Sequence, residues 1–136
     1  MPFLAHSLST LPAFAGYMLM ALGLTALYAI VYTAITPHPE WALLRQGNLS
    51  ASLAFGGSLL GFVIPLGSAI AHSASLLDCA VWGCVALIVQ ILAFFLIRLL
   101  LPDLSRQIEA DKPGPAAAAA LFFLAIGILN AACLVY

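Results

Sequence analysis

The residues that could bind a metal or a haem are scattered along this chain. Its three histidines are His6, His38 and His72. All three flank long apolar runs, whereas a haem held in a helical bundle needs axial histidines inside the bundle. A shared metal site of His6, His72 and Asp78 is left open, although flanking polar residues of this kind are mostly solvated. We therefore predict no catalytic residue, no cofactor site and no metal site, and we expect no enzyme activity.

The cysteines do not have the spacing of a redox centre. Cys79 and Cys84 are five positions apart, which differs from the Cys-x-x-Cys spacing of a thiol oxidoreductase. Cys133 is expected near the same membrane face as Cys79, so a disulfide between these two is left open for an oxidising compartment. Buried free thiols are the more common state of cysteine in membrane spans.

Three polar residues fall inside long apolar runs and need partners there. Gln90 lies near the middle of one run, Asn130 in the outer half of another, and Ser58 in a third. A bare amide in hydrocarbon is costly, so we expect Gln90 and Asn130 to face other helices. Hydrogen bonds between helices explain these residues, and the alternative is a polar pathway or ligand site that they line.

The elements that must position these residues are membrane-spanning helices. The 136 residues are 65% hydrophobic and 7% charged, with a mean hydropathy of +1.16, whereas a soluble domain carries roughly 25% charged residues. A spanning helix needs roughly 20 apolar residues and satisfies its own backbone groups in lipid. Four segments qualify, over about Leu11–Ile35, Ala51–Ala71, Cys79–Leu101 and Pro115–Val135. The lipid bilayer is therefore the main partner, and the net charge of −1 argues against nucleic acid.

The loops after spans one and three each contain a short amphipathic segment. Pro39–Asn48 reads as a short helix that ends at a glycine, with Trp41 and Arg45 one turn apart. An aromatic residue and a cation on one face suit the headgroup region, and both simple anchoring there and docking of a cytoplasmic partner are left open. Leu104–Glu109 is the counterpart in the second half, and Arg98 should extend to the same interface. The residues expected at this interface are His38, Glu40, Trp41, Arg45, Arg98 and Arg106.

The positive charges orient the spans. All four Lys and Arg residues lie in or beside the loops that follow spans one and three: Arg45, Arg98, Arg106 and Lys112. Because cytoplasmic loops carry an excess of Lys and Arg, we predict both charged loops in the cytoplasm. Both termini are then outside, which is the periplasm for a bacterial inner (plasma) membrane.

The two halves of the chain resemble one another. Each has a long helix that ends at a proline, Pro37 or Pro102, followed by a short amphipathic loop and a second long helix. We predict an all-α polytopic membrane protein, with a single domain over residues 1–136. It is built as two parallel tandem two-helix hairpins, over about residues 11–71 and 79–136. Parallel repeats point to a transporter less strongly than inverted repeats do.

Small residues indicate where the helices pack closely. Gly57 and Gly61 form a G-x-x-x-G pattern that Pro65 continues on the same face, and Gly127 offers a similar face on the last span. We expect the Gly57–Gly61 face to pack inside the bundle, and the seam of a homo-oligomer is the alternative. Pro65 should also bend its helix and free the carbonyl near Gly61.

Many short strings of residues carry a likeness to one known family. They are Ile35-Thr36-Pro37-His38, Glu40-Trp41, Arg45, Gly47-Asn48, Ala51–Phe55, Gly57, Leu59-Leu60-Gly61, Ile64-Pro65-Leu66, Ser73–Leu76, Asp78, Trp82-Gly83, Ala86-Leu87, Gln90, Arg98-Leu99, Pro102, Gly127 and Asn130–Cys133. In these strings the chain resembles the YjfL-like, domain-of-unknown-function 350 family of bacteria over nearly its whole length. The resemblance implies an inner-membrane protein made of two copies of a two-helix module. It also implies a setting among phage-shock-type and membrane-remodelling proteins, and it carries over no catalytic residue.

Two functions fit these expectations. The first is a structural or adaptor component of the inner membrane, in which the loops with Trp41 and Arg45 recruit a cytoplasmic peripheral membrane protein in an envelope-stress setting. The second is a small oligomeric channel or carrier, whose path Gln90, Asn130 and the glycine-rich face of the second span would line. No acidic residue falls at mid-membrane, which argues against a proton-coupled carrier.

Overall fold

The computed structural model describes residues 2–134, which form helices joined by short turns. The long helices are α2 (Leu11–Ile35), α4 (Leu49–His72), α5 (Leu76–Leu100) and α7 (Pro113–Cys133). The short helices are α1 (Pro2–Ser9), α3 (Glu40–Arg45) and α6 (Leu104–Glu109). The predicted all-α membrane fold with four spanning helices is confirmed. Val135, the predicted end of the fourth span, lies outside the described residues, as does the predicted end of the second repeat at 136.

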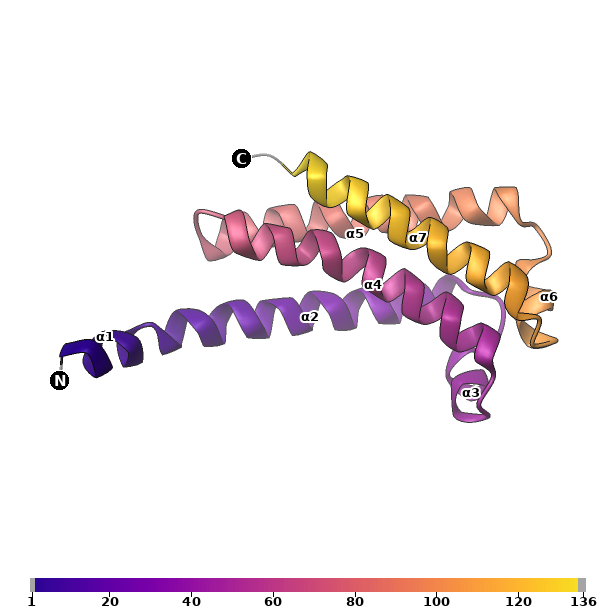
Figure 1. Ribbon diagram of the computed structural model, residues 1–136, viewed down its shortest axis with the longest axis horizontal. Helices are drawn as coiled ribbons and strands as arrows, with labels where there is room; N and C mark the ends of the chain where they lie inside the picture. The colour runs from indigo at the N-terminus through magenta and orange to yellow at the C-terminus, as the bar shows by residue number, and fades with distance from the viewer. Residues whose placement is uncertain (1, 135–136) are drawn as a thin grey trace.

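The first span has a helical extension that the sequence pattern does not indicate. Thr10 alone separates α1 from α2, and together the two helices make an apolar stretch of 34 residues. Figure 1 shows α1 and the first part of α2 lying apart from the other helices, and no residue of α1 is buried. Because roughly 20 residues cross a bilayer, this stretch is longer than one crossing requires.

Local sequence explains where the helices begin and end. α2 ends at Ile35, two residues before Pro37, which cannot donate a helical hydrogen bond. Gly47 has a φ of +80° in the turn after α3, a left-handed conformation that glycine adopts without steric cost. The Asn48 side chain then caps α4 by accepting a hydrogen bond from the backbone N–H of Ala51 at 2.8 Å.

The two halves of the chain have the same order of elements, a long helix, a short helix and a second long helix. α2 and α5 each have 25 residues, and α3 and α6 each have 6. Figure 1 shows α3 and α6 at one end of the molecule, here called the short-helix end, and both chain termini toward the other end. The fold therefore gathers both connecting segments at one end of the bundle.

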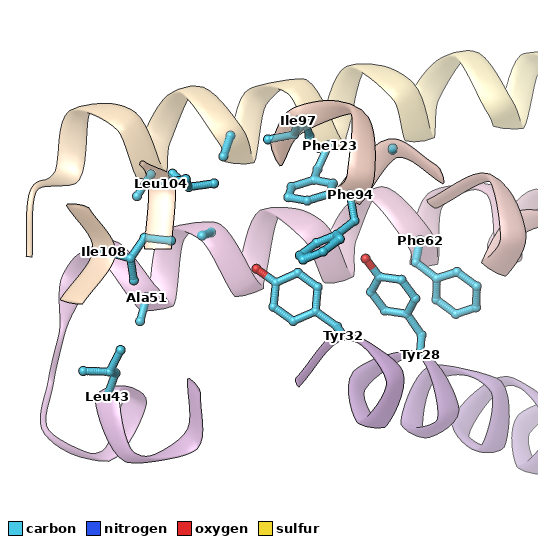
Figure 2. Close-up of a cluster of buried hydrophobic side chains, with 14 of the residues drawn as sticks. Tyr28, Tyr32, Leu43, Ala51, Phe62, Phe94, Ile97, Leu104, Ile108 and Phe123 are labelled. Carbon is cyan, nitrogen blue, oxygen red and sulfur yellow. The ribbon is translucent and has the colours of Figure 1, made fainter. Parts of the chain in front are cut away.

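Aromatic side chains fill the core toward the short-helix end (Figure 2). Tyr28 stacks on Phe62 with ring centroids 4.9 Å apart, and Tyr32 meets Phe94 edge-on at 5.5 Å. Phe123 approaches Tyr32 at 6.3 Å. Each such pair adds about 0.5–1.5 kcal/mol beyond the burial of its area. Since α2, α4, α5 and α7 all contribute a ring, this cluster holds the four long helices together.

Large apolar side chains also cover the outside of the bundle. Leu19, Leu92 and Leu121 are examples, with exposed fractions of 70%, 62% and 67%. On a soluble protein an apolar surface of this extent would drive aggregation. In a bilayer the same side chains are solvated by lipid tails, as the spanning helices require.

α4 and α7 pack most extensively, and glycine makes this possible. A methyl group built on Gly57 would lie 2.5 Å from the Cα of Ala120 in α7. One built on Gly127 would lie 2.6 Å from the Cα of Gly61. Small residues let helix backbones approach where lipid removes the hydrophobic driving force. The G-x-x-x-G face of α4 thus lies against α7, inside the bundle.

Pro65 is buried within α4, and the helix continues through it. Proline has no N–H to donate to the carbonyl four residues earlier, which is that of Gly61. A methyl group on Gly127 would collide with this carbonyl oxygen, so a Cα hydrogen of Gly127 points toward it. Such Cα–H···O contacts contribute about 0.5–1 kcal/mol each. The freed carbonyl of Gly61 therefore lies against α7.

Candidate functional site at the short-helix end

α3 presents an exposed aromatic residue and an exposed cation. Trp41 is 48% exposed, and Arg45 lies four residues later on the same face of the helix. The Trp41 ring also packs against the bundle, with its centroid 5.5 Å from that of Phe55 in α4. About half of the Trp41 surface is therefore open while its position is held by α4.

His38 and Glu40 do not belong to this exposed surface. Their side chains are 3% and 0% exposed, and His38 Nε2 forms an ion pair with Glu40 Oε2. Both residues are expected from the sequence at the cytoplasmic interface, and the structure buries their side chains within the short-helix end. The physical reason is their mutual pairing, because a polar or charged side chain is tolerated in a protein interior when a partner lies beside it.

Arg98 is half-buried in the last turn of α5. Its guanidinium donates a hydrogen bond to the Ser105 hydroxyl of α6 at 3.3 Å and lies 5.7 Å from the centre of the Phe94 ring. Arg98 thus connects the end of α5 to the short helix that follows it. Arg106, in contrast, is exposed on α6 and pairs with Asp103 at 3.1 Å, an arrangement that contributes little to stability.

A small cavity lies between the side chains of His38, Arg98 and Ser105, with room for about one water molecule. Its polar lining comes from α2, the α2–α3 connection, α5 and α6. The polar residues that line it are Tyr32, Thr36, His38, Arg98 and Ser105. Apolar side chains, among them Phe94 and Phe123, complete the wall. The cavity brings Arg98 and His38, which are 60 positions apart, to one place.

A polar contact between the two halves is a feature that sequence reasoning missed. The Asn48 amide donates to the backbone carbonyl of Ile108 at 2.9 Å. Asp111 accepts hydrogen bonds from the backbone N–H of Ser50 at 3.0 Å and from its hydroxyl at 2.9 Å. Asp111 has a φ of +54°, a conformation that aspartate tolerates better than most residues. Its carboxylate also lies at the N-terminus of α4, which favours negative charge.

Inside the bundle, Gln90 and Ser58 lie together. Gln90 Nε2 donates to the backbone carbonyl of Ser58 at 3.0 Å, and the Ser58 hydroxyl is hydrogen-bonded to that of Tyr28. All three side chains are at least 99% buried. Gln90 Oε1 has no hydrogen-bond partner among the described residues. Sequence reasoning did not single out Tyr28, and its only signal is a phenol hydroxyl within an apolar span.

Asn130 does not join this polar cluster by any hydrogen bond in residues 2–134. Its Nδ2 is buried and has no partner within that range. The space beside Gln90 is also filled, because a methyl group on Gly61 would lie 2.5 Å from Gln90 Nε2. The structure therefore brings together two of the three expected intramembrane polar residues.

The outer metal site left open by the spacing does not form. Within residues 2–134, no three His, Cys, Asp or Glu side chains are grouped as metal ligands. Asp78 instead accepts a hydrogen bond from the backbone N–H of Ala74 at 3.0 Å, near the start of α5. The cysteines are free thiols: Cys79 is buried, and Cys84 and Cys133 are exposed.

Four apolar helices, a glycine-mediated crossing and two short helices gathered at one end define a small polytopic α-helical membrane protein. The chain belongs to the family described as Domain of Unknown Function (DUF350), whose sequence model matches residues 6–134. This confirms the resemblance found in the sequence.

Two relatives illustrate how far the similarity extends. The chain is 40% identical over 131 residues to the UPF0719 inner membrane protein YjfL of Escherichia coli strain K12, covering 96% of this chain and 99% of the relative. It is 25% identical over 114 residues to the UPF0719 transmembrane protein YshE of Bacillus subtilis strain 168, covering 84% and 85% respectively. No solved structure matches the chain.

Proposed function

We propose that this protein is a structural or adaptor component of the bacterial inner membrane, without enzyme activity, whose short-helix end binds a cytoplasmic peripheral protein. The positive charge of that end supports a cytoplasmic orientation, because all four Lys and Arg residues lie in or beside the connections that form it. The name of the Escherichia coli relative, an inner membrane protein, supports the location. The proposed setting, envelope stress or membrane remodelling, rests on the family resemblance.

The observation that carries this proposal is the exposed Trp41 beside Arg45 on a helix that is fixed against α4. Trp and Arg are the residue types most often found where a protein interface has its largest binding energy. Because the Trp41 ring is already held by Phe55, it would lose little conformational entropy when a partner covers it. A pre-positioned aromatic residue with a neighbouring cation suits an acidic, partly apolar partner surface.

Comparison of variants tests the proposal. The tagged protein is purified from native membranes in mild detergent, and co-purifying proteins are quantified for the wild type, Trp41→Ala, Arg45→Ala and the control Leu99→Ala. Leu99 is 78% exposed on α5 and contributes no charge or aromatic ring. We expect one cytoplasmic protein to be lost with the Trp41 and Arg45 variants and kept with the control. Equal amounts of the co-purifying proteins with the wild type and all three variants would reject the adaptor function. Trp41 would then be an anchor in the headgroup layer.

A second candidate, a small oligomeric channel or carrier, is favoured by one observation. Gln90 Oε1 is buried without a hydrogen-bond partner in residues 2–134, which is costly unless a permeating species or water uses it. Flux of ions or small solutes into proteoliposomes would test this candidate. Flux that is lost with Gln90→Leu would favour it over the adaptor, and the absence of flux would remove it.

A further inference from the structure

The cavity at the short-helix end is lined on its polar side by hydrogen-bond donors. Arg98 contributes a guanidinium with five N–H groups, of which one bond, to Ser105, is made within the described chain. The Ser105 hydroxyl accepts that bond, so its own hydrogen is free to donate elsewhere. Among residues 2–134, no Asp or Glu lines the cavity, and the Glu40 carboxylate lies against His38 outside the lining. A lining with a cation and hydroxyls suits an anionic oxygen.

His38 adds a second, independent observation. It lines the same cavity, and it is 96% buried, with an exposed fraction of 4%. Its Nε2 is taken by Glu40, whereas its Nδ1 is buried and has no hydrogen-bond partner in residues 2–134. A buried polar nitrogen without a partner costs about 1–3 kcal/mol, so a ligand that satisfies it would be stabilised. His38 Nδ1 is therefore a second polar group that a ligand at the cavity could bond.

Most of the carboxylates at this end already have partners. Glu40 pairs with His38, Asp103 with Arg106, and Asp111 with Ser50. Arg98 has no acidic partner among the described residues, although it is half-buried. The Arg98 guanidinium is therefore not paired with a carboxylate of the described chain. A zwitterionic ligand would also bring an ammonium group toward Arg98 without a carboxylate there to bind it, so an anionic ligand is favoured.

The depth of Arg98 indicates where the anion comes from. Arg98 lies in the last turn of a 25-residue spanning helix, two residues before the helix ends. That position is the level of the lipid headgroups, where phosphate is abundant. Arginine binds phosphate through two parallel hydrogen bonds, and basic pockets between spanning helices are known to bind lipid headgroups. Only one oxygen atom fits within the cavity, so the rest of the phosphate would lie at its mouth.

We propose that Arg98, Ser105 and His38 form a phosphate-binding site that takes one phosphate oxygen of an anionic phospholipid. The site is separate from the Trp41 and Arg45 surface and does not depend on a protein partner. The same chemistry would accept free inorganic phosphate, and the experiment must distinguish the two sources.

The test compares lipid mixtures and variants. The full chain is placed in nanodiscs of phosphatidylcholine alone or mixed with phosphatidylglycerol, and the thermal midpoint and the phosphatidylglycerol retained after delipidation are measured. We expect phosphatidylglycerol to raise the midpoint of the wild type. We expect Arg98→Gln to retain about tenfold less of this lipid or worse, as the loss of hydrogen bonds to a charged group predicts. Arg98→Lys keeps the positive charge but loses the planar pair of N–H donors. It should retain an amount of phosphatidylglycerol between those of the wild type and Arg98→Gln.

Two controls keep the outcome interpretable. Arg45→Ala removes an exposed cation that does not line the cavity and should leave retention unchanged. Ser105→Ala removes a single hydroxyl and should lower retention even if Arg98→Gln fails to fold. Stabilisation of the detergent-purified protein by inorganic phosphate, with no preference for phosphatidylglycerol, would keep the phosphate site but overturn the lipid assignment. Equal retention by the wild type, Arg98→Gln and Ser105→Ala would overturn the site.

Discussion

A Cα hydrogen of Gly127 in α7 points at the backbone of Gly61 in α4, so that a methyl group on Gly127 would lie 2.6 Å from the Gly61 Cα. The two helices therefore approach at a distance that only glycine permits at this pair. Through this contact α7, the last helix of the second half, packs on α4, the last helix of the first half. The crossing makes the two halves one bundle.

We predict that Gly127→Ala and Gly61→Ala each destabilise the bundle by about 1–3 kcal/mol, because the added methyl group overpacks the crossing. Unfolding in mixed detergent micelles, followed by circular dichroism, measures the loss. Gly56→Ala and Gly67→Ala are matched controls in the same helix, since a methyl group there meets nothing within 4 Å. A loss of the same size for the controls would mean that helix backbone effects, and not the crossing, explain the result.

The interior hydrogen bonds make a second prediction. Tyr28→Phe removes the hydroxyl that bonds Ser58 while it keeps the ring stacked on Phe62, and Gln90→Leu removes the donor to the Ser58 carbonyl. Each variant should lose about 0.6–2 kcal/mol, the range of hydrogen bonds between membrane helices. Because both act on Ser58, the double variant should lose less or more than the sum. Additive losses in the same unfolding measurement would contradict a shared network.

Asp111 provides a third prediction, because it combines a cap with a left-handed backbone. Asp111→Asn keeps an acceptor oxygen and tolerates the φ of +54°, so its cost should be small. Asp111→Ala loses the bonds to Ser50 and must adopt an unfavourable φ, for a total of about 2–3 kcal/mol. Asp111→Gly tolerates the left-handed backbone but still loses the bonds to Ser50. Its loss of stability should lie between those of the Asn and Ala variants. Equal stability of the Asn and Ala variants would reject the capping role.

The buried ion pair gives a fourth prediction. Glu40→Ala leaves His38 buried without its partner and should cost about 3–5 kcal/mol. The matched control is Asp103→Ala, which breaks a pair whose side chains are 65% and 85% exposed and should cost at most about 1 kcal/mol. Replacing His38 and Glu40 together by Leu should recover much of the loss, because apolar pairs often substitute for buried ion pairs. A double variant as unstable as Glu40→Ala would indicate that the site needs one of these groups for another reason.

Local backbone chemistry explains why so much of the fold can be predicted. The bounds of α2 and α6 agree with the approximate ranges expected from the sequence, because Pro37 and Pro102 stop or separate helices whatever lies nearby. The spans are equally evident, since only their apolar length must be recognised. α1 was not anticipated because it adds one helical segment to a run that was already long enough to cross the bilayer.

Contacts between distant residues explain what the sequence does not indicate. The burial of His38 and Glu40 depends on how α3 folds back on the bundle, and no pattern within the loop distinguishes a buried pair from an exposed one. Asp111 bonds Ser50 across 61 positions, so neither residue signals the other. Arg98 and His38 share a cavity only after the two halves pack. The residue types alone indicate that these polar side chains need partners. They do not indicate which residues contact one another in the folded protein.

Photo-crosslinking in intact bacterial membranes tests the adaptor function most directly. A photo-reactive residue at Ala42, which is exposed beside Trp41, leaves both Trp41 and Arg45 in place. We expect a crosslink to one cytoplasmic protein, lost when Arg45→Ala is added and kept when the lipid-facing Leu99→Ala is added instead. Crosslinks to lipid alone, or to the chain's own helices, would contradict the adaptor function and leave α3 as an element that anchors the bundle in the headgroup layer.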